Sequence, residues 1–164
     1  FLQDFPPLPS RAQPVFEART RWTPKGCVEL VGKTDLVIGK PEGRISTKLV
    51  IDFKTGWPSP THRQDLRFYA LLETLSRRVP PRRLVTFYLD SADADVEDVT
   101  PSVLEAALAR LEGALTRHAE LTVEQIAPVK RVSTSCRWCP ALATCDEGRQ
   151  HLAIVDDDGG QGFD

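Results

Sequence analysis

The sequence has no methionine, no marked excess of either charge and no long apolar run. No apolar stretch approaches the ~20 residues that a membrane-spanning helix requires, so we expect no membrane anchor. No secretory signal opens the chain, which starts at Phe1, and we expect a cytoplasmic fragment of a longer protein. A net charge of −2 does not by itself indicate a nucleic-acid binder.

Cysteine is scarce, yet three of the 4 cysteines lie close together near the C-terminal end. They are Cys136, Cys139 and Cys145. Such spacing, in a chain without an export signal, indicates metal or cluster ligation rather than a disulfide framework. Thiolates suit both zinc and iron–sulfur clusters, so the spacing alone leaves the occupant open.

The most informative feature is the run that contains Asp52, Phe53 and Lys54. On a strand Asp52 and Lys54 project from the same face, which is costly on an apolar strand unless the pair is used or neutralised. Asp35 lies in an earlier apolar run, and the turn at 39–43 brings the chain back beside it. Two carboxylates can share a hard divalent cation, with the lysine beside an attacked phosphate. This arrangement predicts metal-assisted phosphodiester hydrolysis, although an isolated Asp-X-Lys is more often a solvated ion pair.

Basic residues are candidate phosphate contacts if they line the same cleft as Asp52. The candidates are Arg63, Arg67, Arg77, Arg78, Arg82, Arg83, Lys130, Arg131 and Arg137. Outside such a cleft they are ordinary solvated surface residues.

The turn signals and hydrophobic periodicity predict a small α/β fold with one mixed sheet flanked by helices. We expect strands at 15–22, at 27–38, around Asp52 and at 84–89, the first three as an antiparallel meander. A helix capped by Thr61 is expected to run to about residue 78, and a second helix to start at Pro101, with Thr100 as its cap. The acidic segment 90–98 is expected to be mostly turn, and 121–135 extended or loop.

We expect a single domain. Residues 1–14 read as an irregular lead-in, 15–150 as the folded domain including the cysteine region, and 151–164 as an acidic flexible tail.

Three segments in order now resemble the RecB-like branch of the PD-(D/E)XK nucleases. They are Gly32-Lys33-Thr34-Asp35, Ile51-Asp52-Phe53-Lys54-Thr55-Gly56 and the helical Leu66-Arg67-Phe68-Tyr69-Ala70-Leu71-Leu72, and the resemblance covers roughly 15–148. It implies a restriction-endonuclease-like core in which Asp35 and Asp52 bind Mg²⁺ or Mn²⁺ and Lys54 assists the attacking water. The carbonyl of Phe53, between the two key side chains, is expected to be a further ligand.

The resemblance also implies a role. The substrate would be DNA, and the commoner behaviour of the family is exonuclease action on single-stranded ends. Such enzymes act in DNA repair, recombination or CRISPR adaptation, so a helicase or another subunit of such a machine is an expected partner.

The chain departs from the family pattern on the helix after Lys54. The family has a glutamine four residues before its tyrosine, whereas Asp65 lies four residues before Tyr69 and Gln64 is one place off register. Because residues four apart share a helix face, we expect Asp65 and Tyr69 to contact DNA or order the site. Gln64 can instead form a capping box with Thr61.

Two further positions bear on the site. The family histidine upstream of Asp35 is missing here, so it precedes Phe1 or is absent; His62 lies on the wrong element. Glu17 occupies a position where RecB-like proteins often have a glutamate, but it also reads as an ordinary exposed strand acid.

Nucleases of the AddB type and of CRISPR adaptation carry the same three-cysteine arrangement, completed by a fourth cysteine from far upstream. The resemblance therefore implies Cys136, Cys139 and Cys145 as ligands of a [4Fe-4S] cluster, with zinc as the competing occupant. The fourth ligand is expected upstream of Phe1, which would leave the cluster absent or incomplete in this chain. Cys27, the remaining cysteine, reads better as a buried structural residue.

Two other functions remain open. A catalytically decayed nuclease fold could bind DNA or a partner protein, which the missing histidine and replaced glutamine favour and the intact Asp35, Asp52 and Lys54 oppose. A zinc-stabilised interaction domain with an incidental Asp-X-Lys is the more distant alternative.

Overall fold

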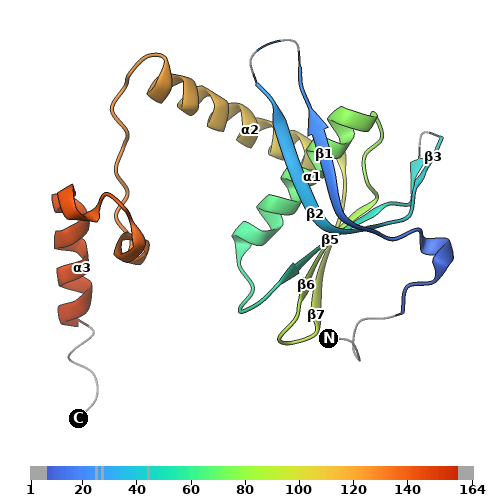
Figure 1. The fold of residues 1–164 in the computed structure, drawn as a ribbon, viewed down its shortest axis with the longest axis horizontal. Coiled ribbons are helices and arrows are strands. Elements are labelled where there is room, and N and C mark those ends of the chain that lie inside the picture. The colour runs from blue at the N-terminus through green and yellow to red at the C-terminus, as the bar shows by residue number, and fades with distance from the viewer. Residues whose placement is uncertain (1–6, 25, 27, 44, 159–164) are drawn as a thin grey trace. The chain divides into compact units, whose positions relative to one another are not determined.

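The computed structural model describes residues 7–24, 26, 28–43 and 45–158, and the chain divides into two compact units (Figure 1). The first unit comprises residues 1–117 and contains the sheet; the second comprises 118–164 and contains the three clustered cysteines. Each is described by itself. Among the described residues, no helix has both the length and the apolar character needed to cross a membrane.

The first unit is built on a five-stranded mixed sheet with the strand order β1-β2-β5-β6-β7. The strands are β1 (Val15–Trp22), β2 (Leu30–Ile38), β5 (Leu49–Lys54), β6 (Arg83–Tyr88) and β7 (Asp93–Asp98). β1, β2 and β5 form the predicted antiparallel meander, β6 runs parallel to β5, and β7 pairs antiparallel with β6. The predicted mixed α/β sheet fold is confirmed.

Three short elements precede or interrupt the meander. A 3-10 turn, η1 (Ser10–Ala12), lies before β1. A small hairpin of β3 (Pro41–Glu42) and β4 (Ile45–Ser46) lies between β2 and β5, where only a turn was expected. It returns the chain so that β5 lies beside β2.

Helix α1 (Pro60–Arg77) connects the parallel strands β5 and β6. Its N-cap is Ser59, whose hydroxyl accepts a hydrogen bond from the Thr61 N–H, so the predicted cap at Thr61 and its capping box with Gln64 are wrong. Pro60 explains the difference, because proline suits the first helical position and extends the helix by one residue before Thr61. Helix α2 (Pro101–Thr122) begins as predicted, with Thr100 accepting from the Val103 N–H at 3.3 Å.

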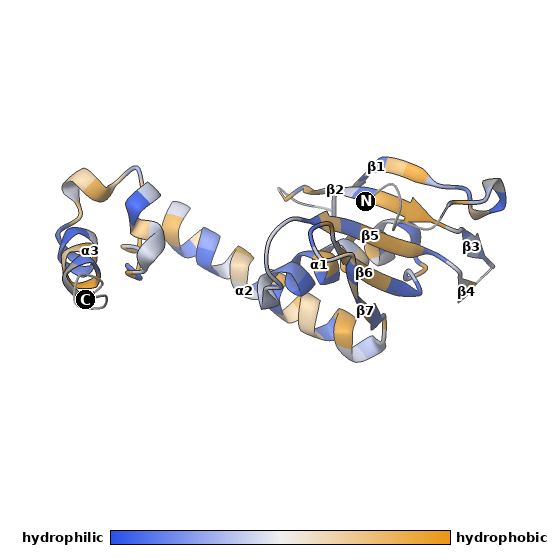
Figure 2. Ribbon diagram, turned by 90° about the horizontal axis from the view of Figure 1, so that it is seen from below, coloured by the Kyte–Doolittle hydropathy of each residue, from blue (hydrophilic) through white to orange (hydrophobic). Residues whose placement is uncertain are grey.

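The buried apolar residues of the sheet form two clusters. Figure 2 shows the apolar colour along β5, the strand at the middle of the sheet. The first cluster faces α1, with Val37, Val50 and Leu84 from the sheet packed against Leu66 and Ala70. The second has its buried centre in Leu36, Ile51 and Phe87. Since residues adjacent along β5 supply different clusters, the strand is apolar on both sides, as expected of a central strand.

Strand β7 is the main element that the sequence prediction missed, because 90–98 was expected to be mostly turn. Its exposure alternates, but the half-buried positions include Asp95 and Glu97, which pair with arginines of α1. A strand held by ion pairs has no apolar alternation for a sequence reading to detect.

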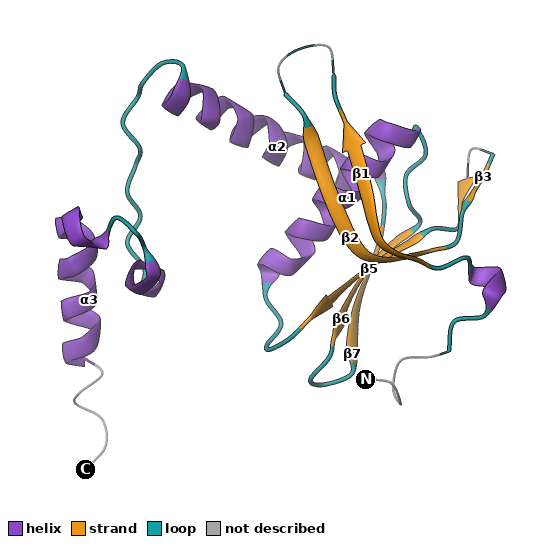
Figure 3. Cartoon of the chain, in the orientation of Figure 1, coloured by secondary structure: helices purple, strands orange, loops and turns teal. Residues whose placement is uncertain are grey.

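The second unit contains η2 (Thr134–Trp138), η3 (Leu142–Thr144) and α3 (Asp146–Asp158). Before them the chain from 125 to 133 has neither helix nor strand (Figure 3). Residues 151–158 are helical, so the flexible tail predicted from 151 is wrong for that stretch. No proline or glycine lies between 151 and 158, so no residue in that stretch interrupts the helix.

Candidate active site

The candidate site lies where β2 and β5 diverge. The register that pairs Leu36 with Ile51 places Asp35 opposite Asp52 when it is continued by one residue. Beyond Leu36 the backbone ladder stops, and the N–H of Phe53 donates instead to Oδ2 of Asp35 at 2.8 Å. A carboxylate thus replaces a backbone carbonyl at this point in the sheet, which fixes Asp35 next to the strand that carries Asp52.

Along β2, successive side chains alternate between the two faces of the sheet, and this alternation is interrupted near Asp35. Gly32 faces α1, since a Cβ there would lie 2.8 Å from Leu72 Cδ2 and 2.9 Å from Tyr69. Strict alternation would put Leu36 on that face too, but Leu36 belongs to the opposite cluster and Val37 to the α1 cluster. The shift turns Asp35 toward the α1 side, the same side as Asp52.

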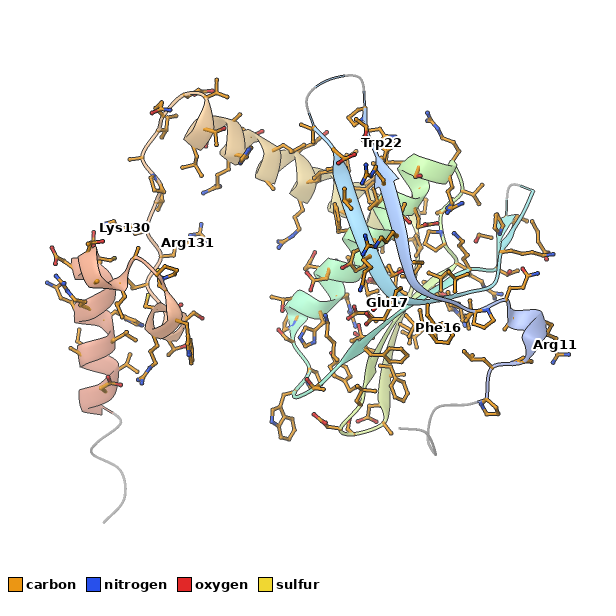
Figure 4. The ribbon with its side chains drawn as sticks, in the orientation of Figure 1. Arg11, Phe16, Glu17, Trp22, Lys130 and Arg131 are labelled. Atoms are coloured by element: carbon orange, nitrogen blue, oxygen red, sulfur yellow. The ribbon has the colours of Figure 1, made fainter. Side chains whose placement is uncertain are left out.

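Glu17 lies at the matching place on β1, beside Phe16 (Figure 4). Its φ of 53° is left-handed, and the β1–β2 pairing skips Glu17 and Asp35 while pairing the residues on either side. Left-handed backbone is costly for a residue with a Cβ, and such strain often marks functional sites. The Glu17 side chain is exposed and pairs with Lys33 at 2.8 Å.

Asp52 and Lys54 share a face of β5, as predicted, with Lys54 Nζ 2.9 Å from Asp52 Oδ2. Asp52 is only 6% exposed, and within the described part of the chain its Oδ2 has no hydrogen bond of regular geometry. Burial raises the pKa of Asp52; Lys54 opposes that effect, while the charges of Asp35 and Asp65 add to it. The Asp52 carboxylate is therefore under-compensated for its burial.

Lys54 remains a cation at neutral pH. Its contact with Asp52 raises the pKa of Lys54, burial acts in the opposite direction, and the nearby Asp65 adds to the increase. A protonated ammonium can hold a water molecule or stabilise negative charge on a phosphate, but it cannot accept a proton. This limits the chemistry that Lys54 can perform.

The side chains of Asp65 and Tyr69, both on α1, lie near Asp52 and Lys54. Burial raises the pKa of Tyr69, and the charges of Asp52 and Asp65 raise it further. Asp65 is exposed, whereas Tyr69 is half-buried. The structure thus brings Asp35, Asp52, Lys54, Asp65 and Tyr69 into one electrostatic neighbourhood.

The donor set fits a hard divalent cation. Across the described residues, no three His, Cys, Asp or Glu side chains converge as a metal site. Mg²⁺ keeps several waters and is commonly held by one or two carboxylates together with substrate phosphate, so two facing carboxylates suffice. The buried Asp52 carboxylate, which faces Asp35 and contacts Lys54, is the group that such a cation would compensate.

Two grooves flank this neighbourhood, and Gln64 lines both of them. The first, of about 670 Å³, lies between the start of α1 and β7 and includes Arg63, Arg67 and Tyr88. The second, of about 450 Å³, lies between β2, α1 and α2 and includes Asp65 and Tyr69. The second groove therefore opens directly onto the candidate site.

The arginines predicted as phosphate contacts near the site are already paired. Arg63 Nη2 lies 2.6 Å from Asp95 Oδ1, and Arg67 Nε lies 2.9 Å from Glu97 Oε2. His62 is oriented by Tyr88, whose hydroxyl is 3.3 Å from its Nδ1. Lys130 and Arg131 belong to the second unit (Figure 4).

Sequence reasoning missed a second charged cluster on the α1 side of the sheet. Lys48, just before β5, contacts Glu73 of α1, and Glu73 also accepts from the Thr20 hydroxyl at 2.6 Å and pairs with Arg77 at 3.2 Å. Both Lys48 and Glu73 are buried. The spacing of Glu73 and Arg77 on one helix face was the one available signal.

The three clustered cysteines lie in the second unit as free thiols. Cys136 is half-buried and its sulfur accepts from the Ser133 N–H at 3.5 Å, whereas Cys139 is exposed. Cys145 and Cys136 both approach Gly148 of α3, where a Cβ would lie 3.4 Å from Cys145 Sγ. Cys27, the weighed fourth ligand, falls outside the described residues.

The chain was compared with curated proteins and with solved structures. No curated protein matches the sequence significantly. The solved structure of SSO0001 has 19% identity and a TM-score of 0.47, with 83% of this chain and 61% of that chain covered. A candidate exonuclease from Eubacterium rectale has 13% identity and a TM-score of 0.47, with 86% and 53% covered. This chain spans less than two thirds of either solved chain.

The sequence profile of the PD-(D/E)XK nuclease superfamily matches residues 5–146, which is most of the chain. The match includes Asp35, Asp52 and Lys54, which the fold brings together between β2, β5 and α1. The chain belongs to the PD-(D/E)XK nuclease superfamily.

Proposed function

We propose that this chain is a metal-dependent DNA nuclease of the RecB-like type, with its active site at Asp35, Asp52 and Lys54. One observation carries the proposal. Asp52 is buried with a raised pKa, opposite a second carboxylate and 2.9 Å from a lysine. Carboxyl groups whose pKa is shifted by burial and by neighbouring charges cluster at functional sites, and membership of the nuclease superfamily supports a nuclease function for this one.

Asp35 and Asp52 would hold Mg²⁺ or Mn²⁺, with the carbonyl of Phe53 as a further ligand. The bound cation would polarise the scissile phosphate and lower the pKa of a coordinated water. Lys54, as a cation, would orient the attacking water and stabilise negative charge on the phosphate. Water would add to phosphorus and the P–O bond to the leaving group would break; one proton of the water would end on the leaving oxygen as a hydroxyl and the other would pass to solvent from the new phosphate.

Asp65 and Tyr69 would act at the edge of the site. Their place on α1 suits contact with the DNA strand or ordering of Lys54, since the Asp65 charge acts on both Lys54 and Tyr69. Exonuclease action on single-stranded ends is the activity we favour, in DNA repair, recombination or CRISPR adaptation. A helicase or another subunit of such a machine would be the partner.

The test is a cleavage assay with end-labelled single-stranded and duplex DNA in Mg²⁺, Mn²⁺ or EDTA. We expect degradation with metal, none with EDTA, and a loss of about 100-fold or more in Lys54→Ala. Lys40→Ala, at an exposed lysine before β3, is the matched control and should cleave normally. Cleavage that survives in Lys54→Ala would place the active site elsewhere.

A catalytically decayed module that binds DNA or a partner protein is the second candidate. The replacement of the family glutamine by Asp65 favours it. No cleavage with either metal by a folded protein that still binds DNA would support this function instead.

For the second unit we propose a [4Fe-4S] cluster held by Cys136, Cys139 and Cys145 and a cysteine from elsewhere, with zinc as the alternative. Three thiols around two short 3-10 helices are the supporting feature. Iron and sulfide reconstitution should give a brown protein with absorbance near ~400 nm. Cys139→Ser should lower the yield, while a colourless protein that retains zinc would favour the alternative.

A further inference from the structure

The two grooves beside the candidate site differ in the charges that they leave available. In the first groove, Arg63 makes a two-pronged contact with Asp95, and Arg67 makes one with Glu97. Bidentate pairing of this kind occupies the donors that a phosphate would need. A DNA strand in the first groove would also lie against Asp93 and Asp95, which would repel its phosphates.

The second groove has the opposite character. Arg110 of α2 lines it and makes no ion pair within the described residues. Lys33 also lines the groove from β2, but Gly32 faces α1, so the alternation of the strand turns the Lys33 side chain to the other face, where it pairs with Glu17. Within the described part of the chain, the second groove therefore offers one unpaired cation, Arg110, to a polyanion, beside a single acid, Asp65.

The second groove also presents aromatic rings. Phe68 and Tyr69 both line it, with ring centroids 6.0 Å apart and planes inclined at 55°. Gly32 lies on the β2 wall, where a larger residue would collide with Tyr69. Aromatic rings beside a basic side chain are the elements with which proteins bind unpaired nucleotides.

The second groove leads to the reacting groups. Asp65 and Tyr69 line it, and both interact electrostatically with Asp52 and Lys54. A strand lying along the groove would thus have one end beside the carboxylates. The first groove also approaches the site, because Tyr88 lines it and pairs with Lys54 in the β5–β6 register, but its arginines are already occupied by Asp95 and Glu97.

We propose that single-stranded DNA reaches the active site along the groove between β2, α1 and α2, with Phe68 stacking on a base and Arg110 contacting a phosphate. The inference rests on the proposed function, since it names the path of that function's substrate. The groove would favour unpaired DNA, because a base can stack on Phe68 only when one of its faces is free. In a duplex both faces of each base are covered by the neighbouring base pairs. The path along this groove is also separate from Arg63 and Arg67, two of the arginines predicted as phosphate contacts.

The test measures binding without cleavage. A fluorescein-labelled oligothymidylate of about 15 nucleotides is titrated with protein in EDTA at several salt concentrations, and anisotropy is recorded. Arg110→Ala should weaken binding several-fold and reduce the slope of log affinity against log salt by about 0.7, the value for one lost phosphate contact on a single strand. Phe68→Leu should weaken binding roughly five-fold or more with an unchanged salt slope.

Arg63→Ala is the matched control and should bind like the wild type, because Asp95 already occupies this arginine. Phe68→Leu keeps an apolar side chain on α1, and circular dichroism melting checks that both groove variants fold. Normal binding by folded Arg110→Ala and Phe68→Leu would overturn the proposal. So would a larger loss in Arg63→Ala, or equally tight binding of a blunt duplex with the same dependence on Phe68.

The groove and the nuclease proposal fail in different ways. If the wild type does not cleave with Mg²⁺ or Mn²⁺ but both groove variants weaken binding, the path stands and the catalytic proposal falls. If the wild type cleaves and both variants bind normally, the catalytic proposal stands and the path falls.

Discussion

Two acid–lysine pairs lie on the α1 side of the sheet, and the protein treats their carboxyl groups in opposite ways. Burial raises the pKa of Asp52. Lys54 lowers this pKa, but the negative charges of Asp35 and Asp65 counteract part of that lowering. Burial also acts to raise the pKa of Glu73, but contacts with Lys48, Thr20 and Arg77 lower it below the usual 4.5. An acid–lysine pair is thus well compensated at Glu73 and poorly compensated at Asp52.

The difference lies in the number of donors around each acid. Glu73 receives a hydroxyl, an ammonium and a guanidinium, so its charge is fully compensated. Asp52 receives one ammonium and faces two further acids. We infer that the Glu73 cluster holds α1 on the sheet, while the Asp52 cluster is left short of positive charge for a cation to complete.

The largest effect is expected for Asp52→Asn on cleavage. The substitution removes a metal-binding charge, so metal-dependent DNA cleavage should fall by about 100-fold or more. Its unfolding free energy should not fall, and should rise by roughly 0.5–1 kcal/mol, because a poorly compensated buried charge is removed. End-labelled DNA assays and urea unfolding measure the two effects; a clear loss of stability would contradict the comparison.

The next largest effect is expected for Glu73→Gln on stability. The change leaves Lys48 buried without its counter-charge, which should cost about 3 kcal/mol of unfolding free energy. The double variant Lys48→Met with Glu73→Leu should recover part of that loss, because an apolar pair leaves no buried charge. Cleavage per folded molecule should be unchanged, and a loss comparable to that of Asp52→Asn would show that the two clusters are not separate.

Ionisation of the two carboxyl groups should affect the unfolding free energy with opposite signs, and acid should remove both effects. The pKa of Glu73 is lowered on folding, so its stabilisation is present above 4.5 and is lost as pH falls through the folded value. The pKa of Asp52 is raised, so its penalty is present above the folded value and is relieved on acidification. Urea unfolding from pH 7 downward should therefore show the destabilisation by Glu73→Gln shrinking, and the stabilisation by Asp52→Asn shrinking too.

Arg77→Ala should have the smallest effect. Arg77 is half-exposed and pairs with Glu73 one turn away, so its loss should cost about 0.3–0.5 kcal/mol. Thermal melting beside Glu73→Gln tests whether Lys48 and Thr20 provide most of the compensation. A cost equal to that of Glu73→Gln would assign the cluster's stability to the exposed arginine instead.

The elements that pack by apolar periodicity were predictable. The meander, α1, the start of α2 and β6 all follow runs of apolar residues bounded by turn or capping residues, and they form where expected. β7 was missed because its inward residues are Asp95 and Glu97, which pack only by pairing with Arg63 and Arg67 of a distant element. The cap of α1 moved to Ser59 because Pro60 starts the helix earlier than Thr61 indicates.

The sequence by itself determined which reactive groups are present: an acid and a lysine two residues apart on one strand face, an earlier acid in the preceding apolar run, and three closely spaced thiols. These are local properties, because alternation on a strand and spacing along the chain are fixed by backbone geometry. Only the tertiary structure decided that Asp52 is under-compensated, that Arg63 and Arg67 are neutralised and that Arg110 is left available. Burial and long-range ion pairing arise from residues far apart in the chain, so no local pattern records them.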